Sequence, residues 1–197
     1  MQATWISQGL LWGAVVVLGF LVLGLIRQLA LLRWRLEQLS ATTPSRIGRD
    51  GLRLGTRAPA FTLERVGGGT FGLGELAGRR HLVVFTQPGC GPCSRVMPAL
   101  NALERKGETQ VVAVCEGDPE ETAAWVEEHA ATFPVLRQER REVSRRYEVL
   151  ATPFAFLIDE EGVVAAKGIV NDDQHVRFLL ESARDRARRE PRLEAVS

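Results

Sequence analysis

The sequence predicts an α/β domain with a mixed central sheet and helices on both faces, preceded by one N-terminal transmembrane helix. Three observations support this prediction. Residues 10–26 are apolar and uncharged, and with Trp5 and Ile6 they approach the roughly 20 residues that cross a bilayer. Beyond residue 54, short strand-type runs alternate with helical patterns. One strand-to-helix junction carries a C-x-x-C motif, Cys90-Gly91-Pro92-Cys93.

Length and charge bound the class of protein. The chain has 197 residues and a formal net charge of +1, so one globular domain of ordinary size is expected. No basic block is large enough to indicate a nucleic-acid partner.

The N-terminal segment predicts an uncleaved single-pass anchor. A cleaved signal peptide has basic residues before its apolar run and a small-residue cleavage site after it. Here no Lys or Arg precedes the run, whereas Arg27, Arg33 and Arg35 follow it. We therefore assign residues 1–39 to the anchor and an amphipathic extension. A Ser-, Thr-, Pro- and Gly-rich linker follows at 40–53, then a domain at 54–190 and a tail at 191–197.

The first half of the domain predicts strands and one long helix. A strand at 61–65 turns through Gly67–Gly69 toward a short extended piece at 70–71, and a buried-type strand at 82–86 leads into the C-x-x-C. The next helix has apolar residues at helical spacing, namely Val96, Met97, Leu100 and Leu103. Pro98 predicts a kink early in this helix.

The second half continues the alternation. We expect a strand at 110–115, a helix opened by Asp118 and Pro119, an extended piece at 133–136 and a short helix at 140–147. Strands at 154–158 and 163–168 flank the turn 159–162 as a hairpin, and a last helix runs from residue 171 or 172 to about 189. This order of elements is that of a thioredoxin-like fold.

The position of the C-x-x-C predicts dithiol-disulfide exchange. At a helix N-terminus, free backbone N–H groups and the helix dipole favour a thiolate, and a second cysteine one turn on can close the ring. A zinc site would need four ligands, and Cys115, His81, His129 and His175 lack ligand spacing. A purely structural disulfide and a binding module with an incidental C-x-x-C are the remaining alternatives. We expect no metal and no cofactor.

Several motifs carry a resemblance to a known family. The stretch Gly55–Phe61 reads G-x-x-A-P-x-F and resembles the opening motif of membrane-tethered, TlpA-like thioredoxin-like redoxins. Within them, the chain resembles the MauD family of methylamine-utilisation accessory proteins. That likeness rests on the following segments: the apolar N-terminal segment ending in Ile26-Arg27-Gln28, Gln87-Pro88 before the C-x-x-C, Thr152–Asp159, and Ala166–Asn171 followed by His175.

The resemblance implies a thiol-disulfide oxidoreductase whose domain faces the periplasm. It would form or isomerise disulfides in an exported protein, the small subunit of methylamine dehydrogenase, with a redox partner in the membrane. By position, Cys90 is the nucleophile and Cys93 the resolving thiol. Pro153 is a cis proline that positions the substrate, and Thr152 presents its backbone to it. A cis bond is least costly before proline.

The chain also departs from related redoxins. Thioredoxins usually carry a tryptophan and an aspartate where this chain has Gly89 and Val84, and cytochrome-maturation redoxins often have a glutamate where it has Val96. Without these carboxylates, water or a substrate group must accept the proton of Cys93. The redox direction also stays open, because Gly91-Pro92 is the central pair of the reducing thioredoxins, whereas MauD proteins tend to differ there.

Two alternative functions follow from the same resemblance. One is a TlpA/ResA-like thiol reductase of cytochrome c maturation. The other is a thiol peroxidase, which needs P-x-x-x-[ST]-x-x-C, whereas Val83 and Gln87 occupy the proline and hydroxyl positions here. Because an activated thiolate needs such neighbours, we disfavour the peroxidase.

The remaining features receive structural interpretations. Arginines after the apolar run favour a cytoplasmic domain. Large domains cross the membrane despite such charges, and we adopt the exported orientation in the inner membrane.

Cys115 ends an apolar strand and is interpreted as a small buried hydrophobe. His81, His129 and His175 are interpreted as surface or element-end residues. The arginines near the end of the last helix, Arg184, Arg186, Arg188 and Arg189, are interpreted as its solvated face.

Overall fold

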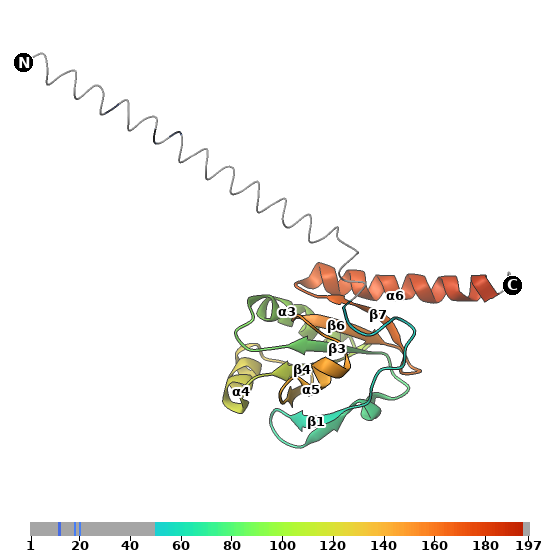
Figure 1. Ribbon diagram of the computed structural model, residues 1–197, viewed down its shortest axis with the longest axis horizontal. Coiled ribbons are helices and arrows are strands. Elements are labelled where there is room, and N and C mark those ends of the chain that lie inside the picture. Colours follow the sequence, from blue (N-terminus) through green and yellow to red (C-terminus); the bar gives the residue numbers. More distant parts are fainter. Residues whose placement is uncertain (1–11, 13–17, 19, 21–49, 195–197) are drawn as a thin grey trace, which may run out of the picture. The chain divides into compact units, whose positions relative to one another are not determined.

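The computed structural model describes residues 12, 18, 20 and 50–194 (Figure 1). Trp12, Leu18 and Phe20 are helical and exposed. The rest of the predicted anchor and nearly all of the predicted linker lie outside the described residues. Among the residues that are described, no helix is both long and apolar enough to cross a membrane.

A mixed sheet forms the centre of the described domain. Its strands stand in the order β2-β1-β5-β4-β3-β6-β7. The three strands β3, β4 and β5 are parallel, and β1, β2, β6 and β7 join them through antiparallel pairs. The strands are β1 (Thr62–Arg65), β2 (Thr70–Gly72), β3 (His81–Thr86), β4 (Gln110–Glu116), β5 (Val135–Gln138), β6 (Phe154–Ile158) and β7 (Val164–Ile169).

Helices cover both faces of this sheet, which confirms the predicted architecture. The described helices are η1 (Leu73–Leu76), α3 (Gly91–Lys106), α4 (Pro119–Glu128), α5 (Glu142–Arg146) and α6 (Asp173–Glu194). Side chains of α3, α4 and α6 share one hydrophobic cluster with one face of the sheet. Side chains of η1 and α5 share a second cluster with the other face.

Some element bounds differ from the sequence prediction. The single turn η1 was not predicted, since four residues carry no helical periodicity. The last helix continues to Glu194, beyond the predicted end near residue 189. Four of the five added residues, Glu190, Arg192, Leu193 and Glu194, are strong helix formers, and the helix continues through Pro191. The exposed Arg184, Arg186 and Arg188 confirm the predicted solvated face.

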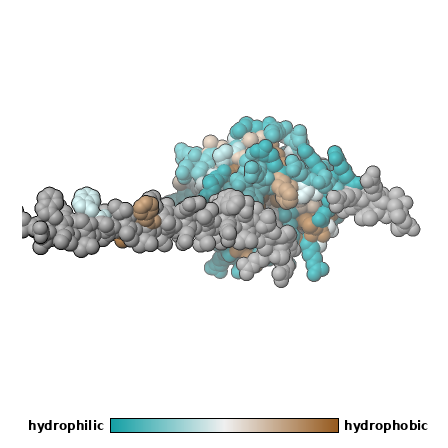
Figure 2. All heavy atoms as spheres, turned by 90° about the horizontal axis from the view of Figure 1, so that it is seen from above, coloured by the Kyte–Doolittle hydropathy of each residue, from teal (hydrophilic) through white to brown (hydrophobic). Residues whose placement is uncertain are grey.

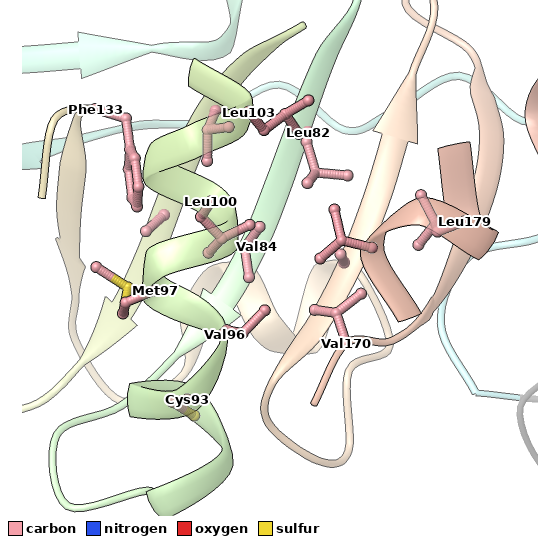
Figure 3. Packing of buried hydrophobic residues seen from close by; sticks show 14 of the residues in the cluster. Leu82, Val84, Cys93, Val96, Met97, Leu100, Leu103, Phe133, Val170 and Leu179 are labelled. Carbon is pink, nitrogen blue, oxygen red and sulfur yellow. The ribbon is translucent and has the colours of Figure 1, made fainter. Parts of the chain in front are cut away.

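The central strand β3 positions the C-x-x-C. All six of its residues are buried, because β4 and β6 flank it and helices cover both faces. Helix α3 packs on one face through Val96, Leu100 and Leu103, as Figure 3 shows beside Leu82 and Val84 of β3. Apolar residues three to four apart form this stripe, and they fix the start of α3 at the end of β3.

The exposed surface carries scattered apolar residues. Figure 2 shows a mainly hydrophilic surface on the described domain as seen from that side. Leu150 and Phe178 are each 73% exposed. Leu150 precedes the Thr152-Pro153 pair by two residues, so one of these apolar side chains lies close in sequence to the predicted site.

The segment that enters the domain packs on it earlier than residue 54. Gly51 N–H donates to the Glu148 carbonyl at 3.0 Å, and Leu52 N–H donates to the Tyr147 carbonyl at 3.2 Å. Gly51 has φ +76°, and a Cβ there would lie 2.7 Å from the ring of Phe156. The close approach and the left-handed backbone together require glycine at position 51.

His81 is an element-end residue, as the sequence analysis proposed, but it does not lie on the surface. It is the first residue of β3 and is only 3% exposed. Its Nδ1 lies 2.8 Å from the Arg79 carbonyl. Burial lowers the pKa of His81, because a charged imidazolium would lose its hydration.

We predict that His81 makes the domain less stable in mild acid. In the unfolded chain His81 binds a proton near its ordinary pKa of about 6.5, whereas the folded chain binds it only at lower pH. The contribution of neutral His81 to stability is therefore complete above the unfolded-state pKa of about 6.5, and it is lost as the pH falls from there through the lower pKa of the folded chain. In denaturant titrations at several pH values, His81→Gln should lose less stability than the unaltered chain between about pH 7 and pH 5. Equal losses in the two proteins would contradict this account.

Candidate active site

The two cysteines of the C-x-x-C form a disulfide at the start of α3. Their Cα atoms lie 5.2 Å apart. Cys90 is the N-cap residue, and its Sγ accepts the backbone N–H of Cys93 at 3.2 Å. Pro92 lies in the first turn, where its missing N–H leaves no hydrogen bond unmade. When the disulfide is reduced, the same N–H and the helix dipole would stabilise a thiolate on Cys90.

The two sulfurs have unequal access to solvent. Cys90 is half-buried, whereas Cys93 is completely buried. Cys93 shares its hydrophobic cluster with Val84 and Val96, the two positions where related redoxins carry carboxylates. Both valines are 0% exposed. An apolar environment disfavours the charged form of a thiol, so the pair is built with one reactive and one protected sulfur.

A second chain segment faces the dithiol. The Thr152-Pro153 peptide bond is cis, which confirms the sequence prediction. The Thr152 carbonyl oxygen lies 3.9 Å and its Oγ1 4.0 Å from Cys90 Sγ. Pro153 is buried, whereas Leu150 and Ala151 are exposed. The loop Val149–Pro153, here called the proline loop, therefore places the backbone of Thr152 beside the more exposed sulfur and carries an exposed apolar side chain, Leu150, two residues earlier.

The proline loop and the residues just before it are held through their carbonyl groups. Val170 N–H donates to the Pro153 carbonyl at 3.2 Å. Arg141 Nη2 donates to the Val149 carbonyl at 3.0 Å and reaches the Leu150 carbonyl at 3.5 Å. The backbone N–H groups of Gly51 and Leu52 also bind the carbonyls of residues 148 and 147, just before the loop. Hydrogen bonds therefore hold the backbone at both ends of the loop.

Lys167 and Arg141 are functional candidates that sequence reasoning missed. Lys167 Nζ donates to the carbonyls of Asp50 and Gly51 at 2.8 and 2.9 Å, and so secures the segment that holds Glu148. Lys167 lies in the Ala166–Asn171 stretch, which the sequence analysis noted without a role. No sequence signal indicated Arg141, because the loop groups that it binds are main-chain carbonyls.

The loop between β3 and Cys90 is held against the end of β4. A Cβ at Gly117 would lie 2.9 Å from ring carbons of Pro88, closer than real Cβ contacts allow. Glycine at position 117 therefore permits the backbone after β4 to approach the loop that carries Gly89 and Cys90. Gly89 itself has φ +73°, a left-handed backbone in which glycine is favoured.

A polar cluster covers the first turn of α3 beside Cys93. Ser94 Oγ lies 2.9 Å from His129 Nε2, and the indole N–H of Trp125 donates to the same Oγ at 3.5 Å. His129 is the C-cap of α4 and is half-buried, so it lies at an element end, as the sequence analysis proposed. His175 lies in the first turn of α6 with its Nδ1 2.7 Å from Asp172. Among the described residues, the side-chain hydrogen bonds of these two histidines go to Ser94 and Asp172 and not to a cysteine sulfur.

Cys115 is a buried free thiol. It is 0% exposed, within the same cluster as Cys93. Burial raises its pKa to about 11, so it stays protonated at neutral pH and is a poor nucleophile. These properties agree with its interpretation as a small hydrophobe. Among the described residues, no group of three or more His, Cys, Asp and Glu side chains is arranged to hold a metal ion.

We predict that the native oxidised protein exposes no reactive thiol. The chain has three cysteines, two are paired, and the remaining Cys115 is inaccessible. A thiol reagent near neutral pH should therefore label the folded protein very slowly and label one thiol per chain after unfolding in guanidinium. Fast labelling of the folded protein at Cys115, located by peptide mapping, would contradict this account.

This arrangement of a disulfide at a helix N-terminus, opposed by a cis-proline loop on a mixed sheet, defines a thioredoxin-like thiol-disulfide oxidoreductase. Residues 54–167 match the AhpC/TSA family model. Methylamine utilization protein MauD of Methylophilus methylotrophus is 32% identical over 181 residues, which cover 91% of this chain and 83% of that protein. MauD of Paracoccus versutus is 33% identical over 180 residues, 89% of this chain and 87% of the relative. The chain therefore belongs to the AhpC/TSA family and, within it, to the MauD proteins.

More distant relatives share the redox domain. Thiol-disulfide oxidoreductase ResA of Geobacillus kaustophilus is 30% identical over 120 residues, 59% of this chain and 69% of that protein. A crystal structure of a candidate DsbE-type thiol:disulfide interchange protein from Chlorobium tepidum superposes with a TM-score of 0.62 at 27% identity. That match covers 67% of this chain and 98% of the solved chain. The likeness to these redox proteins thus covers 59% and 67% of this chain, whereas the MauD likeness covers about 90%.

Proposed function

We propose that this chain is a membrane-anchored oxidoreductase that forms or isomerises disulfides in an exported amine dehydrogenase, the methylamine dehydrogenase small subunit. The observation that carries the proposal is the Cys90-Cys93 pair at the start of α3, with the Thr152 carbonyl 3.9 Å from Cys90 Sγ. The methylamine connection is supported by the MauD relatives, whose names state methylamine utilisation.

The exchange proceeds in two displacement steps. In the reducing direction, the Cys90 thiolate attacks one sulfur of a substrate disulfide, and the other substrate sulfur leaves as a thiolate. The Cys93 thiolate then attacks Cys90 Sγ, which forms the Cys90-Cys93 disulfide and releases the first substrate sulfur as a thiolate. Two electrons pass from the enzyme dithiol to the substrate. The reverse sequence oxidises a substrate dithiol, and isomerisation combines both directions.

The burial of Cys93 affects the second step. Before it attacks, Cys93 must lose its proton, and its neighbours Val84 and Val96 cannot accept one. The departing substrate thiolate or water must therefore take the proton. Because neither Val84 nor Val96 can accept the Cys93 proton, the attack of Cys93 should be slow. The mixed disulfide between Cys90 and the substrate should therefore be long-lived.

The proline loop supports a protein as the substrate. The Thr152 carbonyl beside Cys90 can accept a backbone N–H from an extended segment, as strands do when they add to an exposed edge. Leu150, 73% exposed, adds an apolar contact at the same loop. Pro153, buried in its cis conformation, holds Thr152 in place.

An exported location is part of the proposal. The uncharged run 10–26 serves as the anchor, and disulfides persist outside the cytoplasm. The domain would face the periplasm or cell exterior. A redox protein of the same membrane would return the Cys90-Cys93 pair to its starting state after each cycle.

The similarity to ResA favours a second candidate, a thiol reductase of cytochrome c maturation. The two candidates share the chemistry and differ in the substrate. We place the amine-dehydrogenase candidate first because the MauD likeness covers 91% of this chain and the ResA likeness 59%.

We predict that Cys93→Ser traps the substrate. Without the resolving thiol, ring closure cannot release the mixed disulfide on Cys90, so covalent adducts should accumulate in cells grown on methylamine. Non-reducing gels and mass spectrometry of the purified adducts should identify the methylamine dehydrogenase small subunit as a partner.

Two controls accompany the trap. Cys90→Ser should form no adduct, and Cys93→Ser combined with Cys115→Ala should form the same adducts as Cys93→Ser alone. Adducts that contain only cytochrome-maturation proteins would move the assignment to the second candidate. The absence of any reducible adduct would contradict the exchange mechanism.

A further inference from the structure

Arg141 is an arginine whose side chain binds the proline loop. Its Nη2 donates to the Val149 carbonyl at 3.0 Å and lies 3.5 Å from the Leu150 carbonyl. Both carbonyls belong to the loop that brings Thr152 to Cys90. At this end of the loop Val149 is buried in the second hydrophobic cluster, and its N–H donates to the Ser144 carbonyl at 2.8 Å, whereas Leu150 is largely exposed. The guanidinium adds the side-chain hydrogen bonds to the loop carbonyls, including that of the exposed Leu150.

A carboxylate orients the same guanidinium. Arg141 Nε lies 3.3 Å from Glu116 Oε2. Glu116 ends β4 and directly precedes Gly117, which touches Pro88 in the loop before the dithiol. Arg141 thus joins the end of β4, next to the Cys90 loop, to the proline loop on the other side of the site. The guanidinium carries separate donors on Nε and Nη2, so one side chain serves the carboxylate and the carbonyls, and the single nitrogen of a lysine does not reproduce this fork.

The backbone at this position does not explain an arginine. Arg141 has φ 56° and ψ 33°, and the preceding Arg140 has φ 49°. Both residues are in the left-handed region of backbone conformation. Glycine adopts this region without a steric penalty, whereas a residue with a Cβ pays one. Glycine would serve this turn better than arginine does. The reason for an arginine at this position is therefore its side chain, which binds Val149, Leu150 and Glu116.

We propose that Arg141 is a positioning residue that holds the proline loop against the dithiol so that a protein substrate can dock beside Cys90. The inference rests on the proposed exchange function and adds a residue to it. Arg141 acts through the carbonyls of Val149 and Leu150 and touches neither sulfur. A small disulfide needs only Cys90, whereas a protein disulfide also needs the loop backbone. Loss of Arg141 should therefore slow exchange with protein disulfides selectively.

The test compares two oxidants on the reduced full-length chain in detergent. The protein disulfide is insulin, and the small one is hydroxyethyl disulfide. For Arg141→Gln, Arg141→Lys and Arg141→Gly, the rate constant with insulin should fall about tenfold, the factor that corresponds to one hydrogen bond to a charged group. The rate constant with hydroxyethyl disulfide should stay within about twofold of the unaltered chain.

The set of variants separates positioning from general stability. Arg141→Gly removes the side chain and also relieves the left-handed strain, so its thermal midpoint should not fall, although its insulin rate does. Arg140→Gln is the matched control: Arg140 is the neighbouring exposed arginine with the same backbone region, and this variant should keep both rates.

Each other outcome has a defined meaning. Unchanged insulin rates in Arg141→Gln and Arg141→Gly would overturn the proposal. An equal fall with both oxidants would also overturn it, because the dithiol itself would then be disturbed. If the unaltered chain reacts with neither oxidant, the proposed exchange function fails, and the inference fails with it.

Discussion

The backbone N–H of Cys93 donates to Cys90 Sγ at 3.2 Å, and the chemistry of the molecule depends on this contact at the first turn of α3. The bond exists because Cys90 is the N-cap of a long helix whose apolar stripe is packed on β3. Packing of Val96, Leu100 and Leu103 thus fixes the position of a sulfur several residues away. Without the buried face of α3, the helix N-terminus could not hold a charge in a defined place.

Around that contact, the protein makes the two sulfurs unequal. Cys93 lies fully within the hydrophobic cluster, whereas Cys90 is half-buried beside a main-chain carbonyl. Valines replace the carboxylates of related redoxins beneath the pair. The site therefore relies on the helix N-terminus to activate Cys90, and on the substrate or water to accept the proton of the Cys93 thiol. A third cysteine, Cys115, lies in the same cluster. It does not compete with Cys90 as a nucleophile, because burial raises its pKa to about 11.

The sequence could predict the features that local patterns determine. The strand before the C-x-x-C and the amphipathic helix after it follow from residues close together in the chain. The cis bond at Thr152-Pro153 was implied by the resemblance to known redoxins. The burial of His81 could not be predicted, because it depends on how the elements around β3 fold over it. Lys167 binds carbonyls 116 and 117 residues away, and Arg141 binds main-chain groups that carry no sequence signature. Contacts to backbone are the part of a site that residue types do not encode.

The central claim is that the start of α3 makes Cys90 the nucleophile. The most direct measurement is the rate of iodoacetamide alkylation of each thiol against pH in the reduced full-length chain, with the modified cysteine identified by peptide mapping. Cys90 should react first, and its rate should reach half of its maximum below the pH of about 8.5 that is typical of a free cysteine. Cys93 should react more slowly throughout the range. Alkylation of Cys93 at an equal or greater rate near neutral pH would contradict this account of the site.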